Sequence, residues 1–153
     1  MYKRVMVGVD DNFATNQVLD TALRLCKQLG SKLAICHAID ETIFASQKPK
    51  AMMSTRMQGV EERLRTEAMT FLEKAKTMAD EAGVDAELLV VCSQEDDVAE
   101  MLVKAANEWR ANLLVVGENE LRGLERYFVD SVGESLLRTS NIPLLVVHAK
   151  TPQ

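Results

Sequence analysis

The feature that most constrains the fold of this chain is the alternation of short apolar runs with segments of helical spacing. Residues 33–39, 88–92 and 113–116 are nearly continuous in apolar side chains, as is typical of strands that are buried on both faces of a parallel sheet. Between such runs, apolar residues recur at helical spacing, as in the series Ala14, Val18, Ala22, Leu25 and Leu29. Strands that alternate with helices predict an α/β fold in which helices cover both faces of a parallel sheet.

The predicted elements form one uninterrupted series. We expect strands at residues 3–9, 32–39, 86–92, 113–117 and 143–148, and helices at residues 14–29, 55–82, 96–110 and 131–139. No repeat, linker or low-complexity segment divides the chain, and 153 residues is a usual length for one domain. The sequence therefore predicts a single domain over residues 1–150, built on a five-stranded parallel sheet.

Composition and charge exclude several classes of protein. The formal net charge of −5 argues against a general nucleic-acid binder, which needs a basic surface to displace counterions. No apolar run approaches the roughly 18–20 residues that span a bilayer. A signal peptide is not predicted, because Lys3, Arg4 and Asp10 bracket only a short apolar run. We therefore expect a cytoplasmic protein with no nucleic-acid partner and no membrane insertion.

The three cysteines indicate a reducing compartment. Cys26 falls on a helical pattern, whereas Cys36 and Cys92 lie in apolar strand runs. No CxxC pair and no Cys/His cluster at metal-ligand spacing is present. We expect all three to be buried thiols that pack as small apolar side chains, and we predict no metal site.

A candidate anion site lies in the C-terminal block, residues 113–147. An apolar strand ends on Gly117, a polar loop containing Gly123 follows, and a helix is predicted to begin near Ser131. Backbone N–H groups at a helix N-terminus, such as those of Ser131 and Val132, favour negative charge. This arrangement predicts a site for phosphate or another anion.

The same block resembles the nucleotide loop of the universal stress protein family. The ATP-binding members of that family carry Gly, two residues, Gly, nine residues, Gly and then Ser or Thr. Here the register begins at Gly117 and ends at Ser131, with Glu120 and Asp130 in place of the two inner glycines. The match to the loop is partial, and its two mismatches fall where phosphate groups would lie.

The resemblance extends over nearly the whole chain. Residues 5–10 are similar to the family's first strand, residues 33–40 to its second, and residues 98–117 to its third helix and fourth strand. The resemblance implies a Rossmann-like sheet of the adenine nucleotide alpha hydrolase type, with strand order 3-2-1-4-5. In such a sheet, ligands bind at the carboxyl ends of the strands where the order reverses, which here is between the first and fourth strands.

Two residues at that edge are candidate ligand contacts. Asp10 follows the first strand, and its carboxylate can accept two hydrogen bonds from a ribose diol; the alternative is that Asp10 helps to cap the turn before the next helix. Ala38 matches the position whose backbone meets the adenine in ATP-binding relatives; the alternative is plain strand packing. Both alternatives stay open from the sequence.

The phosphate end leaves nucleotide binding open as well. Glu120 and Asp130 lack the backbone freedom of glycine and bring carboxylates close to a polyanion. Arg122 and Arg126 offer compensating charge, and a bound Mg²⁺ would turn Asp130 into a ligand. ATP or AMP, with or without Mg²⁺, and no nucleotide at all are therefore competing hypotheses.

No catalytic residue is predicted. Neither His37 nor His148 lies at a recognisable spacing from a nucleophile and an acid, so we expect both to be structural. The favoured function is a regulatory protein that acts by binding a nucleotide or an unidentified protein partner. The alternatives are a slow ATPase, for which no general base or metal-carboxylate set is identifiable, and a nucleotide-free interaction module.

Two segments are candidates for association. The apolar segment from Ile142 to Val147 comes last and is expected at a sheet edge, where exposed strands pair with other chains. Members of the universal stress protein family commonly dimerise there, so we expect a homodimer. Met52, Met53 and Met57 follow the second strand and either pack on the sheet or form a lid or partner surface.

Overall fold

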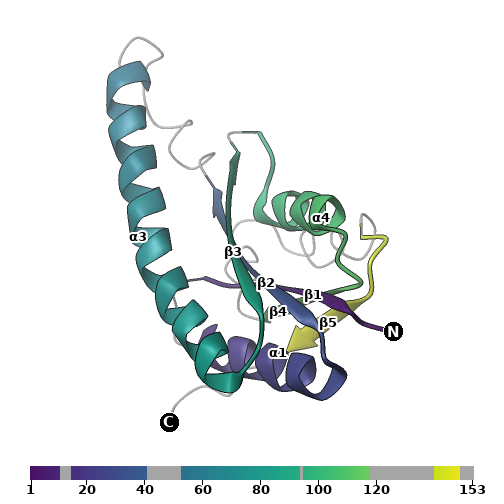
Figure 1. Cartoon of the computed structure of the whole chain (residues 1–153). Helices are drawn as coiled ribbons and strands as arrows, with labels where there is room; N and C mark the ends of the chain where they lie inside the picture. The colour runs from purple at the N-terminus through teal and green to yellow at the C-terminus, as the bar shows by residue number, and fades with distance from the viewer. Residues whose placement is uncertain (11–14, 41–52, 94, 118–139, 149–153) are drawn as a thin grey trace.

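The fold is a five-stranded sheet in which every pairing is parallel. The computed structural model describes residues 1–10, 15–40, 53–93, 95–117 and 140–148. Its strands are β1 (Arg4–Gly8), β2 (Lys32–Asp40), β3 (Ala86–Ser93), β4 (Leu113–Gly117) and β5 (Leu144–Val147). They lie in the order β3-β2-β1-β4-β5 (Figure 1). The parallel sheet and the expected strand order are confirmed.

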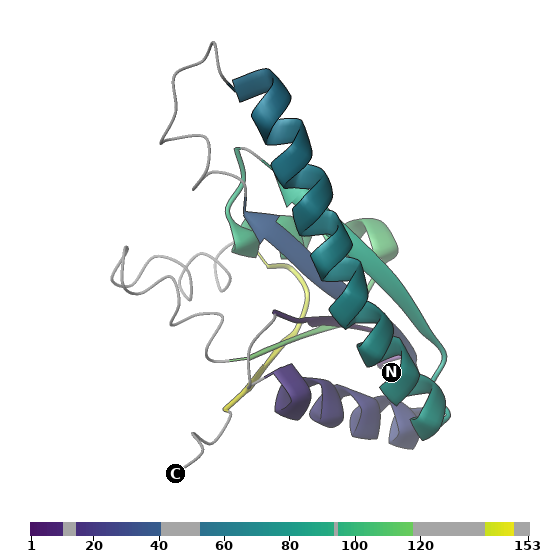
Figure 2. The ribbon, with the colours of Figure 1, turned by 90° about the vertical axis from the view of Figure 1, so that its left-hand side faces the viewer.

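Helices cover both faces of this sheet. The described helices are α1 (Thr15–Leu29), α3 (Met53–Ala82) and α4 (Val98–Trp109). Residues of α1 and α3 share one buried cluster with Val5 and Val7, whereas residues of α4 share the other with Met6. α1 and α3 therefore lie on one side of the sheet and α4 on the other (Figure 2). The helix predicted over residues 131–139 lies outside the described residues.

β1 is the centre of the core. Its side chains alternate between the two faces, and Val5, Met6 and Val7 all have 0% exposure. Complete burial of an apolar side chain of this size stabilises the fold by roughly 1.5–3 kcal/mol relative to leaving it exposed. The continuous apolar run at this point in the sequence is explained by helices on both sides of a strand that has neighbours at both edges.

α1 and α3 end where the sequence places glycine. Gly30 and Gly83 adopt φ values of +66° and +73°, a left-handed conformation that closes a helix without Cβ strain. α4 ends differently, on Arg110 with φ +61°, although non-glycine residues disfavour this region. After each of these turns, the chain continues into the amino end of the next strand.

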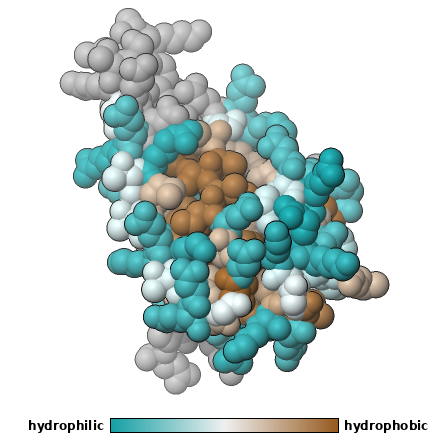
Figure 3. Space-filling model, in the orientation of Figure 1, coloured by the Kyte–Doolittle hydropathy of each residue, from teal (hydrophilic) through white to brown (hydrophobic). Residues whose placement is uncertain are grey.

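The two edge strands bring apolar side chains to the surface. In β3, Leu88, Leu89, Val90 and Val91 are each partly exposed, and a hydrophobic patch lies over β3 between α3 and α4 (Figure 3). β5 forms the opposite edge, where Leu145 is 36% exposed. The expectation that the last strand lies at a sheet edge is confirmed.

Gly117 is in close contact with α1. It ends β4 and is buried, and a Cβ added there would approach Cγ2 of Val18 to 2.8 Å. Val18 is itself only 3% exposed, and its branched side chain has little rotamer freedom in a helix. Glycine is therefore required here for α1 to pack against the end of β4.

We expect Gly117→Ala to destabilise the protein by about 1–3 kcal/mol, because the new methyl group overpacks a rigid contact. Val18→Ala should restore space, so the double variant should be more stable than the sum of the two single effects predicts. Urea denaturation of the four proteins measures this coupling. Strict additivity would show that the contact between Gly117 and Val18 does not limit the packing.

Candidate functional site

The sheet has one point at which its winding reverses. From β1 the chain passes through β2 to β3 with α1 and α3 on one face, then returns through α4 on the other face to β4. β4 lies beside β1, with Val7 opposite Val115. In open α/β sheets, ligands bind outside the carboxyl ends of the strands at such a point. The carboxyl ends of β1, β2 and β4 therefore define the candidate site.

Three of the residues singled out from the sequence lie at this edge. Asp10 follows β1 and is exposed, Ala38 is partly buried near the end of β2, and Gly117 ends β4. The other three, Gly123, Ser131 and Val132, lie outside the described residues, as do Glu120 and Asp130. The structure thus describes the strand ends of the candidate site but not the segment predicted to meet phosphate.

The three strands do not end at the same level. β1 pairs with β2 only as far as Gly8 and Cys36, and one further bond runs from the Val9 N–H to the Cys36 carbonyl at 2.8 Å. β2 continues beyond this point to Asp40, paired with β3. β2 therefore extends past the end of β1.

A histidine contacts the chain where β1 leaves the sheet. His37 Nδ1 lies 2.9 Å from the Val9 carbonyl oxygen, and its ring meets Phe71 of α3 edge to face, with centroids 4.9 Å apart. The structure thus gives one ring nitrogen of His37 a partner, as the sequence analysis expects, whereas the role of the residue stays a prediction. The sequence did not identify its partner, because that contact joins two strands through a side chain.

The prediction that the cysteines are buried is correct for two of the three. Cys26 and Cys36 are buried, and burial raises the pKa of the Cys26 thiol to about 11, so it stays protonated. The prediction for Cys92 is wrong: it is partly exposed, and Arg65 Nη2 donates to its Sγ at 2.7 Å. Its strand, β3, lies at the sheet edge and pairs only with β2 among the strands that the structure describes, which leaves Cys92 less covered than a residue of a central strand.

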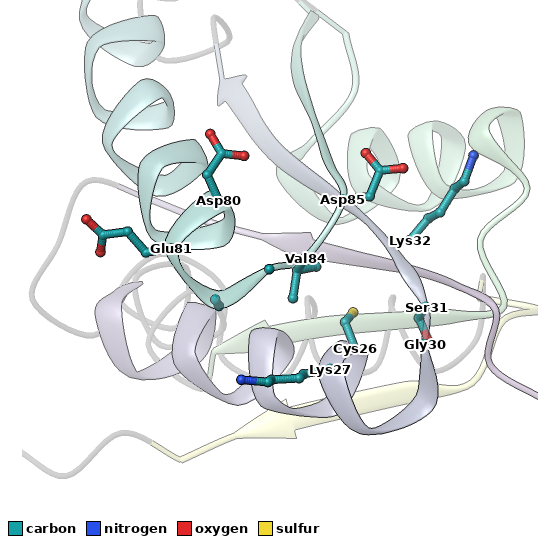
Figure 4. Close-up of a pocket in the computed structure, with 11 residues that line it drawn as sticks. Cys26, Lys27, Gly30, Ser31, Lys32, Asp80, Glu81, Val84 and Asp85 are labelled. Atoms are coloured by element: carbon teal, nitrogen blue, oxygen red, sulfur yellow. The ribbon is translucent and has the colours of Figure 1, made fainter.

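A hollow of about 680 Å³ lies at the opposite end of the sheet, between the turns that follow α1 and α3 (Figure 4). Charged side chains line it, including Lys27, Lys32, Asp80, Glu81 and Asp85. They come from separate elements and do not converge on a common point in Figure 4. The hollow follows from how the two helices end, and it is distinct from the candidate site.

An acidic group surrounds the start of α4. Asp97 caps the helix by accepting from the Glu100 N–H at 2.8 Å, and Lys104 Nζ lies 2.6 Å from Asp96 Oδ2. The hydrogen bond from Lys104 lowers the pKa of Asp96, whereas the charge of Asp97 raises the pKa of Glu100. These contacts explain the cluster of acidic side chains by its part in capping α4. Within the described ranges, no set of His, Cys, Asp and Glu side chains is arranged to hold a metal.

Among the residues that the structure describes, none of the helices combines the length and apolar character needed to cross a bilayer.

Comparison with known proteins places this arrangement in a family. The model of the universal stress protein family matches residues 1–148. Universal stress protein YxiE of Bacillus subtilis is 26% identical over 151 residues, which cover 97% of this chain and 100% of that protein.

Solved structures agree with the sequence match. A crystal structure of a universal stress protein family member from Burkholderia pseudomallei is 25% identical with a TM-score of 0.73, covering 95% of this chain and 96% of that one. A universal stress protein in complex with cAMP is also 25% identical, with a TM-score of 0.70 and coverage of 97% and 98%. Because family sequence features and the fold coincide over almost its whole length, this chain belongs to the universal stress protein family.

Proposed function

We propose that this chain is a regulatory universal stress protein that binds an adenine nucleotide at the carboxyl ends of β1, β2 and β4 and acts through binding instead of turnover. The observation that supports the proposal is that Asp10, Ala38 and Gly117 lie at or just beyond the carboxyl ends of β1, β2 and β4, where the strand order reverses. The complex of a similar protein with cAMP supports an adenine nucleotide over other small anions.

The backbone of Ala38 suits an adenine base. Along β2, alternate residues face β1: the Lys32 N–H donates to Lys3, and the Cys36 carbonyl accepts from Val9. By the same alternation, the N–H and carbonyl of Ala38 face the β1 side, beyond the last β1 residue bonded to β2. One donor beside one acceptor complements the N1 and 6-amino groups on the edge of adenine.

Asp10 suits the ribose. A carboxylate accepts hydrogen bonds from two neighbouring hydroxyl groups without rearrangement, and Asp10 is exposed one residue beyond Val9. A base held at Ala38 and a sugar held at Asp10 would direct the phosphates towards the end of β4, where Gly117 begins the loop to Ser131.

We expect calorimetric titration of the wild-type protein to detect ATP or AMP binding. Asp10→Asn keeps the shape of the side chain but replaces one acceptor oxygen with a donor, so affinity should fall by about 10–30-fold, as for a charged hydrogen bond of roughly 1.5–2 kcal/mol. Asp20→Asn is the matched control, because Asp20 is an exposed residue of α1 paired with Arg24. Equal affinity of the Asp10 variant and the wild type would remove Asp10 from the site.

In this proposal, the carboxylates of Glu120 and Asp130 weaken the binding of the phosphate groups. We expect Glu120→Gly with Asp130→Gly to raise ATP affinity by about 2 kcal/mol, roughly thirtyfold, because two like charges leave the neighbourhood of the triphosphate. The gain for AMP should be smaller, since AMP carries less charge. Titrations with and without Mg²⁺ test the opposite account: tighter wild-type binding that depends on Mg²⁺ and is lost in the double variant would make Asp130 a metal ligand.

Association through β5 is the second part of the proposal. Its support is the position of β5 at the sheet edge and the exposure of its apolar Leu145, since such an edge pairs with another chain unless blocked. A two-fold homodimer is the usual closed assembly.

We expect Leu145→Lys to convert a dimer into a monomer in light scattering at micromolar concentration, because charge on an edge strand blocks strand pairing. Leu145 is preferred to Val146, which packs against the core beside α4. Met69→Lys is the control, as Met69 is an exposed residue of α3 at 38%. A monomeric wild type, or a Leu145 variant that stays dimeric, would contradict the proposed interface.

A further inference from the structure

We propose that His37 is a positioning residue that fixes the Val9–Asp10 peptide and thereby sets the place of the Asp10 carboxylate in the candidate site. The inference deepens the proposed function and rests on it for the ligand. Its basis is the contact of His37 Nδ1 with the Val9 carbonyl oxygen at 2.9 Å, at the point where β1 leaves the sheet.

The Val9 carbonyl needs a partner at this position. Val9 is 3% exposed, and a polar backbone group left unpaired away from water is unfavourable. The ladder between β1 and β2 reaches the Val9 N–H, which donates to Cys36. His37 then supplies a side-chain donor to the carbonyl of the same residue, so Val9 is held on both its polar backbone groups.

Fixing this carbonyl fixes the next residue. The Val9 carbonyl and the Asp10 nitrogen and Cα belong to one planar peptide unit. A donor that holds the carbonyl direction therefore also sets the direction in which Asp10 begins. The carboxylate of Asp10 remains at the surface, but its origin is tied to the interior through Val9.

The contact also determines which ring nitrogen of His37 carries a hydrogen. A carbonyl oxygen only accepts, so Nδ1 carries the hydrogen in this contact. Both nitrogens are donors in the charged ring, so the contact persists when His37 is protonated.

The ring is held in turn by α3. Phe71 meets it edge to face, with an angle of 84° between the ring planes, and edge-to-face pairs are a favoured aromatic arrangement. The neighbouring residue of α3, Leu72, has 0% exposure, so this part of the helix is firmly docked. A continuous path of contacts runs from α3 through Phe71 and His37 to Val9 and Asp10.

Two substitutions separate the hydrogen bond from the ring packing. His37→Asn retains a side-chain N–H close to the place of Nδ1 but removes the ring. His37→Phe retains an aromatic ring against Phe71 but removes the donor. If the donor positions Asp10, nucleotide affinity measured by calorimetry should fall about tenfold in His37→Phe and be largely rescued in His37→Asn.

A double-variant cycle shows whether His37 acts through Asp10. In the Asp10→Asn background, His37→Phe should lower affinity by less than twofold, because the carboxylate that it positions is already gone. A full tenfold loss in that background, or wild-type affinity of His37→Phe alone, would overturn the proposal. Urea denaturation of each variant ensures that only folded proteins are compared.

A measurement without ligand keeps this inference separate from the proposed function. Nitrogen NMR of the imidazole rings should show an Nδ1–H tautomer for one histidine, and His148→Gln identifies the signal, because the chain has 2 histidines. The Asp10 amide should exchange with solvent more rapidly in His37→Phe than in His37→Asn.

The outcomes for the two ideas differ. If the wild type binds neither ATP nor AMP, the proposed function fails, and the tautomer and the Asp10 exchange rates alone decide whether His37 anchors the peptide. An Nε2–H tautomer, or equal exchange of Asp10 in both variants, would refute the anchor whether or not nucleotide binds.

Discussion

The pairing of β1 between β2 and β4 is the constraint on which the rest of the structure depends. Because Val5, Met6 and Val7 are fully buried by layers on both faces, neither face of β1 is available to a ligand. Its neighbours occupy both edges. A ligand can therefore reach β1 only where the strand ends, and there β2 continues beyond the last residue that pairs with β1.

The sequence predicted what is encoded by local pattern and missed what depends on contacts between distant residues. Helix periodicity and glycine stops gave the described elements to within a few residues, because both signals are local. The partial exposure of Cys92 was not predicted, because an apolar run does not show whether its strand lies at an edge. The contact between His37 and Val9 was also beyond reach, since it depends on the register of two strands. The phosphate segment of the candidate site remains a prediction.

Gly117 shows that a glycine in a sequence motif can have two separate physical reasons. In the family pattern it opens the nucleotide loop, yet here its lack of a Cβ is also demanded by Val18 of α1. The packing contact alone accounts for a glycine at this position, whether or not a phosphate binds nearby. Its presence in the sequence therefore carries less weight for nucleotide binding than Asp10 and Ala38, whose polar groups have the chemistry that a nucleoside would use.

α3 is long enough that a small tilt at one end corresponds to a large displacement at the other. Among the α3 residues whose burial the structure describes, the fully or nearly fully buried ones lie in the carboxyl-terminal half: Ala68, Leu72, Ala75 and Ala79. The amino-terminal half of the helix rises past the sheet (Figure 1). The stretch before Ala68 measures about 22 Å at 1.5 Å per residue. A tilt of about 10° around the docked half would displace the amino end of such a helix by about 4 Å. Phe71 lies near the beginning of the buried half of α3. A small rotation of the helix beside His37 therefore corresponds to a displacement of several ångströms where α3 begins.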